Sequence, residues 1–291
     1  MSETIGGSVS STSIPDLLSS PAAKWDPCNG KAFSVRSHGY MTSKVKENSL
    51  EALYECYHVS FVRGKNGKID RSEIFSALVQ QGKINMGASK DEVPEYLVVN
   101  GQIPMEGPSL LGGQSADDFG ASLISWYKLR DGVDKECPAL QLLMRMLVDQ
   151  GCSQRHGVSF KAIGYCETWE NLGLPEAVSG YNGKPSLITD SLRICHESNV
   201  AILDFDVRKW SYLARNCLNS AMSNKETSKL NQMKVAFLME GKSPDELPEQ
   251  VLGCFYISNM DKDEFPMIDA GLQDTENNGE KRGGILRSLF G

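Results

Sequence analysis

The sequence has 291 residues, of which 40% are hydrophobic and 23% are charged, and its formal net charge is −7. This composition is typical of a globular protein with a full hydrophobic core, and the length leaves one or two domains open. The negative charge argues against a general nucleic-acid-binding protein, because phosphate contacts need a clustered basic surface. No apolar stretch reaches the roughly 20 residues that a membrane-spanning helix needs. The N-terminus lacks a secretory signal, so we expect a cytoplasmic, non-secreted protein.

Eight cysteines are scattered along the chain without any C-x-x-C pair, which predicts reduced thiols in an intracellular protein. Four of them lie inside apolar stretches and are expected in the core: Cys166, Cys195, Cys217 and Cys254. Two pairs, Cys56 with His58 and Cys152 with His156, could supply metal ligands if their segments met in space. Structural zinc sites show tighter pair spacing, so the prediction is that the protein holds no metal and no cofactor.

Composition divides the chain into three parts. Residues 1–24 are polar and rich in serine and glycine, which predicts disorder, and residues 267–291 form a tail that is first acidic and then basic. Residues 25–266 contain no long linker and no internal repeat. We therefore expect this central part to be one domain.

The first predicted elements are a strand at 53–62, a helix at 73–81 and strands at 96–99 and 122–128. The strands are short apolar runs with period-two alternation. A helix at 140–148 lies between Pro138 and Gly151, as expected because proline favours the first helical turn and glycine the end. The connecting segment 104–120 is long and rich in turn residues, which is typical of functional or mobile loops.

The second half is predicted to contain strands at 158–166, 200–207, 233–239 and 251–257, and a helix at 212–222. In the strand 158–166, Phe160 and Ala162 share one face while Lys161 takes the other. The helix follows Ser211, a suitable N-cap. Strands interrupted by about three helices, without regular β–α–β alternation, predict an α+β fold with a largely antiparallel sheet.

The sequence ILDFDV at residues 202–207 is the strongest local indication of a possible site. On a strand, three apolar side chains would face the core: Leu203, Phe205 and Val207. Asp204 and Asp206 would then lie together on the opposite face, where they need solvent, a cation or basic partners such as Arg208 or Arg215. A cation site is one interpretation. A solvated strand face or a structural ion pair is the interpretation we favour.

The segment GKNGKIDRSE at residues 64–73 is similar to the second half of a calcium-binding loop. The first two ligand positions of such a loop would fall on Val62 and Gly64, neither of which is acidic. A hairpin turn at Asn66 and Gly67 followed by a helix start explains the same residues. No nucleotide-binding or hydrolase motif occurs elsewhere, so we expect no enzymatic activity.

The C-terminus is basic and amphipathic, and such a segment can dock to an anionic membrane or to a groove on a protein partner; plain disorder is the alternative. The docking residues would be Lys281, Arg282, Ile285, Leu286, Arg287, Leu289 and Phe290. Two glycines, at 283 and 284, weaken this segment as a helix.

Five stretches, read in chain order, carry a resemblance to a known family. They are FSVRSHGY at 33–40, YLVVNGQIP at 96–104, GYNGKP at 180–185, DFDVRKWSYLAR at 204–215 and LPEQVLGC at 247–254. Over residues 25–266 the sequence resembles the enhanced disease resistance 2 C-terminal domain family. The resemblance implies a role in lipid-linked or membrane-associated regulation.

The sequence departs from the plant members of that family in two ways. Those members often carry a pleckstrin homology domain and a lipid-binding START domain upstream, for which this sequence has no room. A histidine common after the D-x-D is replaced by Arg208. The resemblance brings no catalytic residues. For Arg36, Arg215 and Glu249 we favour a structural role over ligand binding, because buried arginine–carboxylate pairs explain them.

The sequence therefore predicts a non-enzymatic, lipid-associated or membrane-peripheral regulatory domain, with Asp204, Asp206, Arg208, Arg215 and Arg36 as candidates for ligand or partner contacts. A protein-interaction or scaffold domain without a lipid ligand is the alternative. An interior apolar cavity would favour the lipid carrier, and a solid interior would favour docking at the surface.

Overall fold

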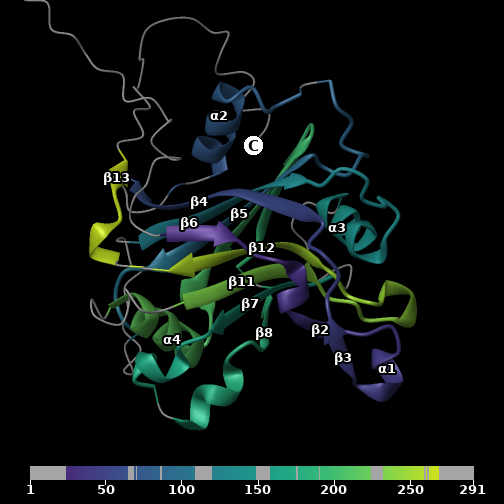
Figure 1. Cartoon of the computed structure of the whole chain (residues 1–291). Helices are drawn as coiled ribbons and strands as arrows, with labels where there is room; N and C mark the ends of the chain where they lie inside the picture. The colour runs from purple at the N-terminus through teal and green to yellow at the C-terminus, as the bar shows by residue number, and fades with distance from the viewer. Residues whose placement is uncertain are drawn as a thin grey trace, which may run out of the picture.

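The computed structural model describes residues 24–64, 69, 71–85, 87–108, 120–148, 158–174, 176–189, 191–223, 232–258, 260 and 262–268. Two β-sheets are stacked on one another, as Figure 1 shows. The six-stranded sheet has the order β13 (Met267–Ile268), β4 (Tyr54–Gly64), β6 (Gly120–Leu129), β5 (Tyr96–Pro104), β10 (Val200–Asp206) and β9 (Arg193–Glu197). The five-stranded sheet has the order β1 (Lys24–Pro27), β12 (Val251–Ser258), β11 (Gln232–Met239), β7 (Phe160–Cys166) and β8 (Pro185–Ile188).

Most strand pairs are antiparallel, and the exceptions are β10 with β5 and β13 with β4. A separate two-stranded ribbon is made by β2 (Ser34–Arg36) and β3 (Lys46–Asn48). The α-helices are α1 (Tyr40–Ser43), α2 (Arg71–Gln80), α3 (Pro138–Val148) and α4 (Tyr212–Ser223). The predicted α+β fold with a largely antiparallel sheet is thus confirmed.

The main core lies between the two sheets and is filled by large side chains. Phe237 of β11 lies at its centre, within 6.5 Å, ring centroid to ring centroid, of four other aromatic rings: Tyr127, Phe160, Phe205 and Phe255. The amphipathic helix α3 adds its buried leucines to this core. Burial of such aromatic rings is among the largest single contributions to folding.

The outward face of each sheet is covered by a different segment. Helix α2 lies over the six-stranded sheet (Figure 1), with Ile74 and Leu78 packed against Trp126 and Ile202. On the other side, residues that precede β4 lie over part of the five-stranded sheet, where Phe33 joins a third cluster of buried residues. Both sheets therefore bury residues on two faces, so their strands carry fewer polar positions than a single-sided sheet would.

The long predicted elements are confirmed. The helix expected at 212–222 is α4, and the Ala214 N–H donates to the Ser211 hydroxyl at 3.3 Å, as a capping serine should. Six strands were missed: β1, β2, β3, β8, β9 and β13. Each is two to five residues long, too short for alternation to stand out. The predicted turn at Asn66 and Gly67 lies outside the described residues, as do residues 109–119 of the long loop.

Candidate functional site

Asp204 lies in a buried polar cluster beneath α2. The parallel register of β10 on β5 places it beside Asn100, whose amide donates to the Asp204 carboxylate at 2.5 Å and to the Ile69 carbonyl at 3.0 Å. Arg71, the first residue of α2, brings its Nε to 4.0 Å from the other carboxylate oxygen. Asp204 is only 4% exposed. We call Asn100, Asp204 and Arg71 the amide cluster. The burial of Asp204 corrects the expectation of a solvated strand face at this residue, and the nearby Arg71 supports the other alternative, a structural ion pair.

Asp206 shares the strand face with Asp204 but is held differently. It caps the 3₁₀ helix η5 (Val207–Lys209), where its carboxylate accepts from the Arg208 backbone N–H at 3.0 Å. The Arg208 Nε donates to Asp206 Oδ1 at 2.8 Å and its Nη2 donates to Oδ2 at 2.5 Å, which is the bidentate geometry that arginine favours. Arg208 is thus the basic partner that the sequence suggested. Arg215 lies half-buried in α4, which follows η5.

Arg36 lies in a second cluster, on the outward face of the five-stranded sheet. Its guanidinium donates to Glu240 at 3.0 Å and lies 3.7 Å from Glu249. The ammonium of Lys161 on β7 reaches Glu249 at 2.5 Å and Glu240 at 3.9 Å. Two cations and two carboxylates therefore neutralise one another in this charge cluster. The site residues predicted from sequence are divided between opposite sides of the stacked sheets.

Glu249 is the centre of the charge cluster, with a side chain only 2% exposed. Besides Lys161, its carboxylate accepts from the backbone N–H groups of Gly241 at 3.1 Å and Arg36 at 3.2 Å. Burial lowers the pKa of Lys161, and the nearby Glu249 carboxylate opposes that change. A buried lysine is tolerated here because its ammonium donates to the Glu249 carboxylate and lies near a second carboxylate, that of Glu240.

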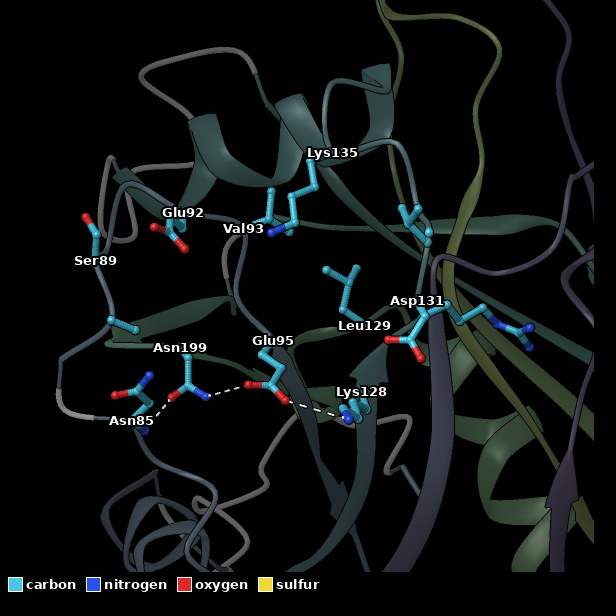
Figure 2. A pocket seen from close by; sticks show the side chains of 14 residues that line it. Asn85, Ser89, Glu92, Val93, Glu95, Lys128, Leu129, Asp131, Lys135 and Asn199 are labelled. Atoms are coloured by element: carbon cyan, nitrogen blue, oxygen red, sulfur yellow. Dashed lines mark hydrogen bonds and ion pairs between the residues drawn. The ribbon is translucent and has the colours of Figure 1, made fainter.

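A cavity of about 390 Å³ opens where β5 begins and β6 ends. Figure 2 shows Asn85, Asn199, Glu95 and Lys128 in a row along it. The Asn85 N–H donates to Asn199 at 2.9 Å, Asn199 donates to Glu95 at 3.2 Å, and Lys128 lies 3.8 Å from Glu95. These polar groups are engaged with one another, and they join the ends of three strands and the segment that follows α2.

The outward face of β7 and β11 beyond the charge cluster is exposed and aromatic. Tyr165 is 41% exposed and Tyr181 is 59% exposed, and each has a lysine ammonium over its ring, Lys234 at 5.8 Å and Lys184 at 5.2 Å. These four residues, together with Tyr256 beside Lys234 in the sheet, are called the tyrosine face. Lys234 and the Tyr256 hydroxyl both contact Glu167, which anchors one side of this face.

A tight turn ties the segment that follows Tyr181 to β7, the strand that carries Tyr165. The Gly183 N–H donates to the Gly164 carbonyl at 2.9 Å, which ties the turn between η4 (Glu176–Tyr181) and β8 to β7. Gly183 has φ of +74°, and a Cβ there would lie 3.1 Å from the Tyr165 ring. The positive φ favours glycine at this position, and the hydrogen bond to Gly164 holds the turn of the segment GYNGKP against β7.

A comparison with known families places these features in context. The family described as Protein ENHANCED DISEASE RESISTANCE 2, C-terminal matches residues 25–261, a stretch that contains both clusters and the tyrosine face. The chain belongs to this family. No curated protein and no solved structure matches the chain.

Four of the five stretches that resemble the enhanced disease resistance 2 C-terminal family meet in two pairs, one in each cluster. The stretches 33–40 and 247–254 supply Arg36 and Glu249 to the charge cluster. Similarly, 96–104 and 204–215 supply Asn100 and Asp204 to the amide cluster, and 180–185 forms the turn of the tyrosine face. The two pairs thus contribute to the buried clusters of this family member, whereas the stretch 180–185 contributes to its surface.

Sequence reasoning missed Lys161 and the two exposed tyrosines. A lysine inside an otherwise apolar strand, between Phe160 and Ala162, is the signal that could have marked a buried charge. The residues predicted to dock through the tail, Lys281 to Phe290, lie outside the described residues, as do Cys152 and His156. Within the described helices, none is long and apolar enough to cross a membrane.

Proposed function

We propose that this chain is a non-enzymatic regulatory domain that associates peripherally with anionic membrane surfaces through the tyrosine face. The observation that carries the proposal is the exposure of Tyr165 on β7 and of Tyr181 at the end of η4, which leads into a turn tied to β7, each with a lysine ammonium over its ring. Tyrosine rings partition to the boundary between lipid headgroups and acyl chains, while lysines bind the headgroup phosphates. Exposed Lys184 is the lysine suited to a headgroup phosphate, because the Lys234 ammonium is already paired with Glu167 at 2.5 Å.

A surface mode is preferred to a lipid held inside the fold. The aromatic rings around Phe237 occupy the space between the two sheets, where an internal lipid would have to lie. The basic tail, residues 281–291, would add electrostatic attraction from the same chain. Each Lys or Arg near an anionic surface contributes about 1 kcal/mol, so several together are needed for stable binding.

The proposal includes a cytoplasmic location and the absence of catalysis. The seven cysteines within the described residues are all free thiols, in keeping with a reducing compartment. The charged groups along the surface cavity, such as Glu95 and Lys128, are held by structural partners. That arrangement favours a structural role for them over acid–base chemistry.

The test is sedimentation of the full chain with vesicles of phosphatidylcholine alone or with phosphatidylserine added. We expect binding to the anionic vesicles that weakens as salt is raised. The double variant Tyr165→Ser/Tyr181→Ser and the variant Lys184→Glu should each lower the bound fraction. Matched controls are Val148→Ser, which removes an exposed apolar side chain on α3, and Lys135→Glu, which reverses a charge beside the cavity.

Each other outcome is informative. If deletion of residues 281–291 abolishes binding while the tyrosine variants bind normally, the tail is the membrane contact and the tyrosine face is not. If no vesicle is bound, the membrane proposal is wrong. A protein partner that is lost with the same tyrosine variants would then identify this face as a protein-interaction surface, the alternative function.

A further inference from the structure

Two cysteines face one another across the edge of the five-stranded sheet. The antiparallel ladder between β1 and β12 ends with Pro27 opposite Phe255, and the same register continued by one residue would place Cys28 opposite Cys254. Cys28 packs against the buried cluster that contains Cys254. Directly opposed residues in antiparallel strands have Cα atoms about 4.5–5.5 Å apart, and disulfides span about 4.4–6.8 Å. The Cys254 thiol already contacts the Cys28 carbonyl, with Sγ and O 3.0 Å apart.

The two thiols differ in exposure and in acidity. Cys28 is half-buried at the edge of the sheet, whereas Cys254 is 2% exposed. A hydrogen bond from the Cys254 thiol lowers the pKa of Cys28, and the Lys234 ammonium acts in the same direction against the effect of burial. The same hydrogen bond and burial raise the pKa of Cys254. Cys28 is therefore the thiol that reacts first, since the thiolate is the nucleophile.

We propose that Cys28 and Cys254 are an oxidation site that closes reversibly into a cross-strand disulfide, with a hydroperoxide as oxidant. The Cys28 thiolate attacks the peroxide, breaks its O–O bond and becomes a sulfenic acid, and the peroxide oxygen that leaves takes up a proton as water or alcohol. The Cys254 sulfur then attacks the sulfenic sulfur, and its proton leaves with the displaced hydroxyl as a second water. A dithiol reductant restores both thiols by exchange.

The disulfide would add a covalent link to an edge strand that is now held by its backbone ladder and by the packing of Trp25 against the core. Among the strands that the structure describes, β1 is at the edge of its sheet and pairs with β12. The next outward-facing pair along this ladder is Asp26 and Tyr256, and Tyr256 belongs to the tyrosine face. Oxidation would thus make the border of the proposed docking surface more rigid, although the site itself is independent of any membrane binding.

The experiment is a peroxide titration of the reduced full chain, followed by alkylation, intact mass measurement and non-reducing peptide mapping. We expect the loss of two hydrogens, a peptide that joins Cys28 to Cys254, reversal by dithiothreitol and a higher midpoint of thermal unfolding. Cys28→Ser should abolish the loss. Cys137→Ser, which removes another half-buried thiol, should leave it unchanged.

Cys254→Ser supplies a second and independent readout. Without its partner, the Cys28 sulfenic acid should persist and be captured by dimedone, which the wild-type protein should not show. The proposal is overturned if the mapped bond joins other cysteines, if Cys28→Ser loses two hydrogens as readily as the wild type, or if Cys28 oxidises past the sulfenic acid with no bond to Cys254.

Discussion

The amide cluster and the charge cluster each stabilise a nearly buried carboxylate, but they do so with different partners. Each holds a nearly buried carboxylate on the outward face of a sheet, Asp204 at 4% exposure and Glu249 at 4%. Asp204 accepts a hydrogen bond from a neutral amide, with an arginine at 4.0 Å. Glu249 has a lysine at 2.5 Å and an arginine at 3.7 Å.

The difference predicts how much folding stability is lost when one member of each cluster is removed. Removing one member of a compact set of opposite charges leaves another charge buried and uncompensated. Removing a carboxylate from an amide leaves an unsatisfied but neutral donor, which costs less. The covering segments also differ, because α2 closes one cluster and the loop and strand around Arg36 close the other.

The largest effect is expected from Glu249→Ala. We expect it to lower the free energy of unfolding by about 3–5 kcal/mol, because the Lys161 ammonium loses its nearest counter-charge in a buried position. Urea unfolding followed by circular dichroism measures the change. The double variant Lys161→Met/Glu249→Leu should recover part of the loss, since no charge is then left unpaired. A double variant as unstable as the sum of the two single changes would show that the pair is not coupled.

Asp204→Ala should have an intermediate effect. The Asn100 amide loses its carboxylate acceptor at a buried position, and we expect a loss of about 1–3 kcal/mol. Asn100→Ala should cost a similar amount, and the double variant should cost less than the two changes added together. An unfolding free energy that stays within about 0.5 kcal/mol of the wild type would place Asp204 outside the set of structural residues.

The smallest effect should appear as a pH dependence of the charge cluster alone. Burial holds the pKa of Lys161 below its ordinary 10.5 in the folded protein. Between that lowered pKa and 10.5, the unfolded chain binds more protons than the folded one, so stability contributed at this site rises as the pH rises. The stability difference between the wild type and Lys161→Met should therefore move in favour of the wild type across this alkaline window. A difference that stays constant or moves the other way contradicts the assignment.

The local sequence pattern predicted the long elements well, because apolar residues in a half-buried strand or helix recur with the period of that element. Phe160 and Ala162 face the main core, as expected, and so do Leu203 and Phe205. Membership of the family could also be recognised from the sequence, because the five stretches occur in the family's order. The short edge strands such as β1 and β8 could not be predicted, because they are defined by pairing with a neighbouring strand and have no internal sequence pattern.

The candidate site was predicted less completely, for a related reason. Alternation correctly put Lys161 and Asp204 on the faces that point away from the main core, and chemistry correctly suggested Arg208 as a partner of Asp206. Nothing local indicates whether an outward face meets water or another segment. The sequence by itself thus determined which residues share a face. Only the tertiary structure decided that α2 covers Asp204, that the Arg36 segment covers Lys161, and that Tyr165 stays exposed, because burial depends on segments that the chain brings in from far away.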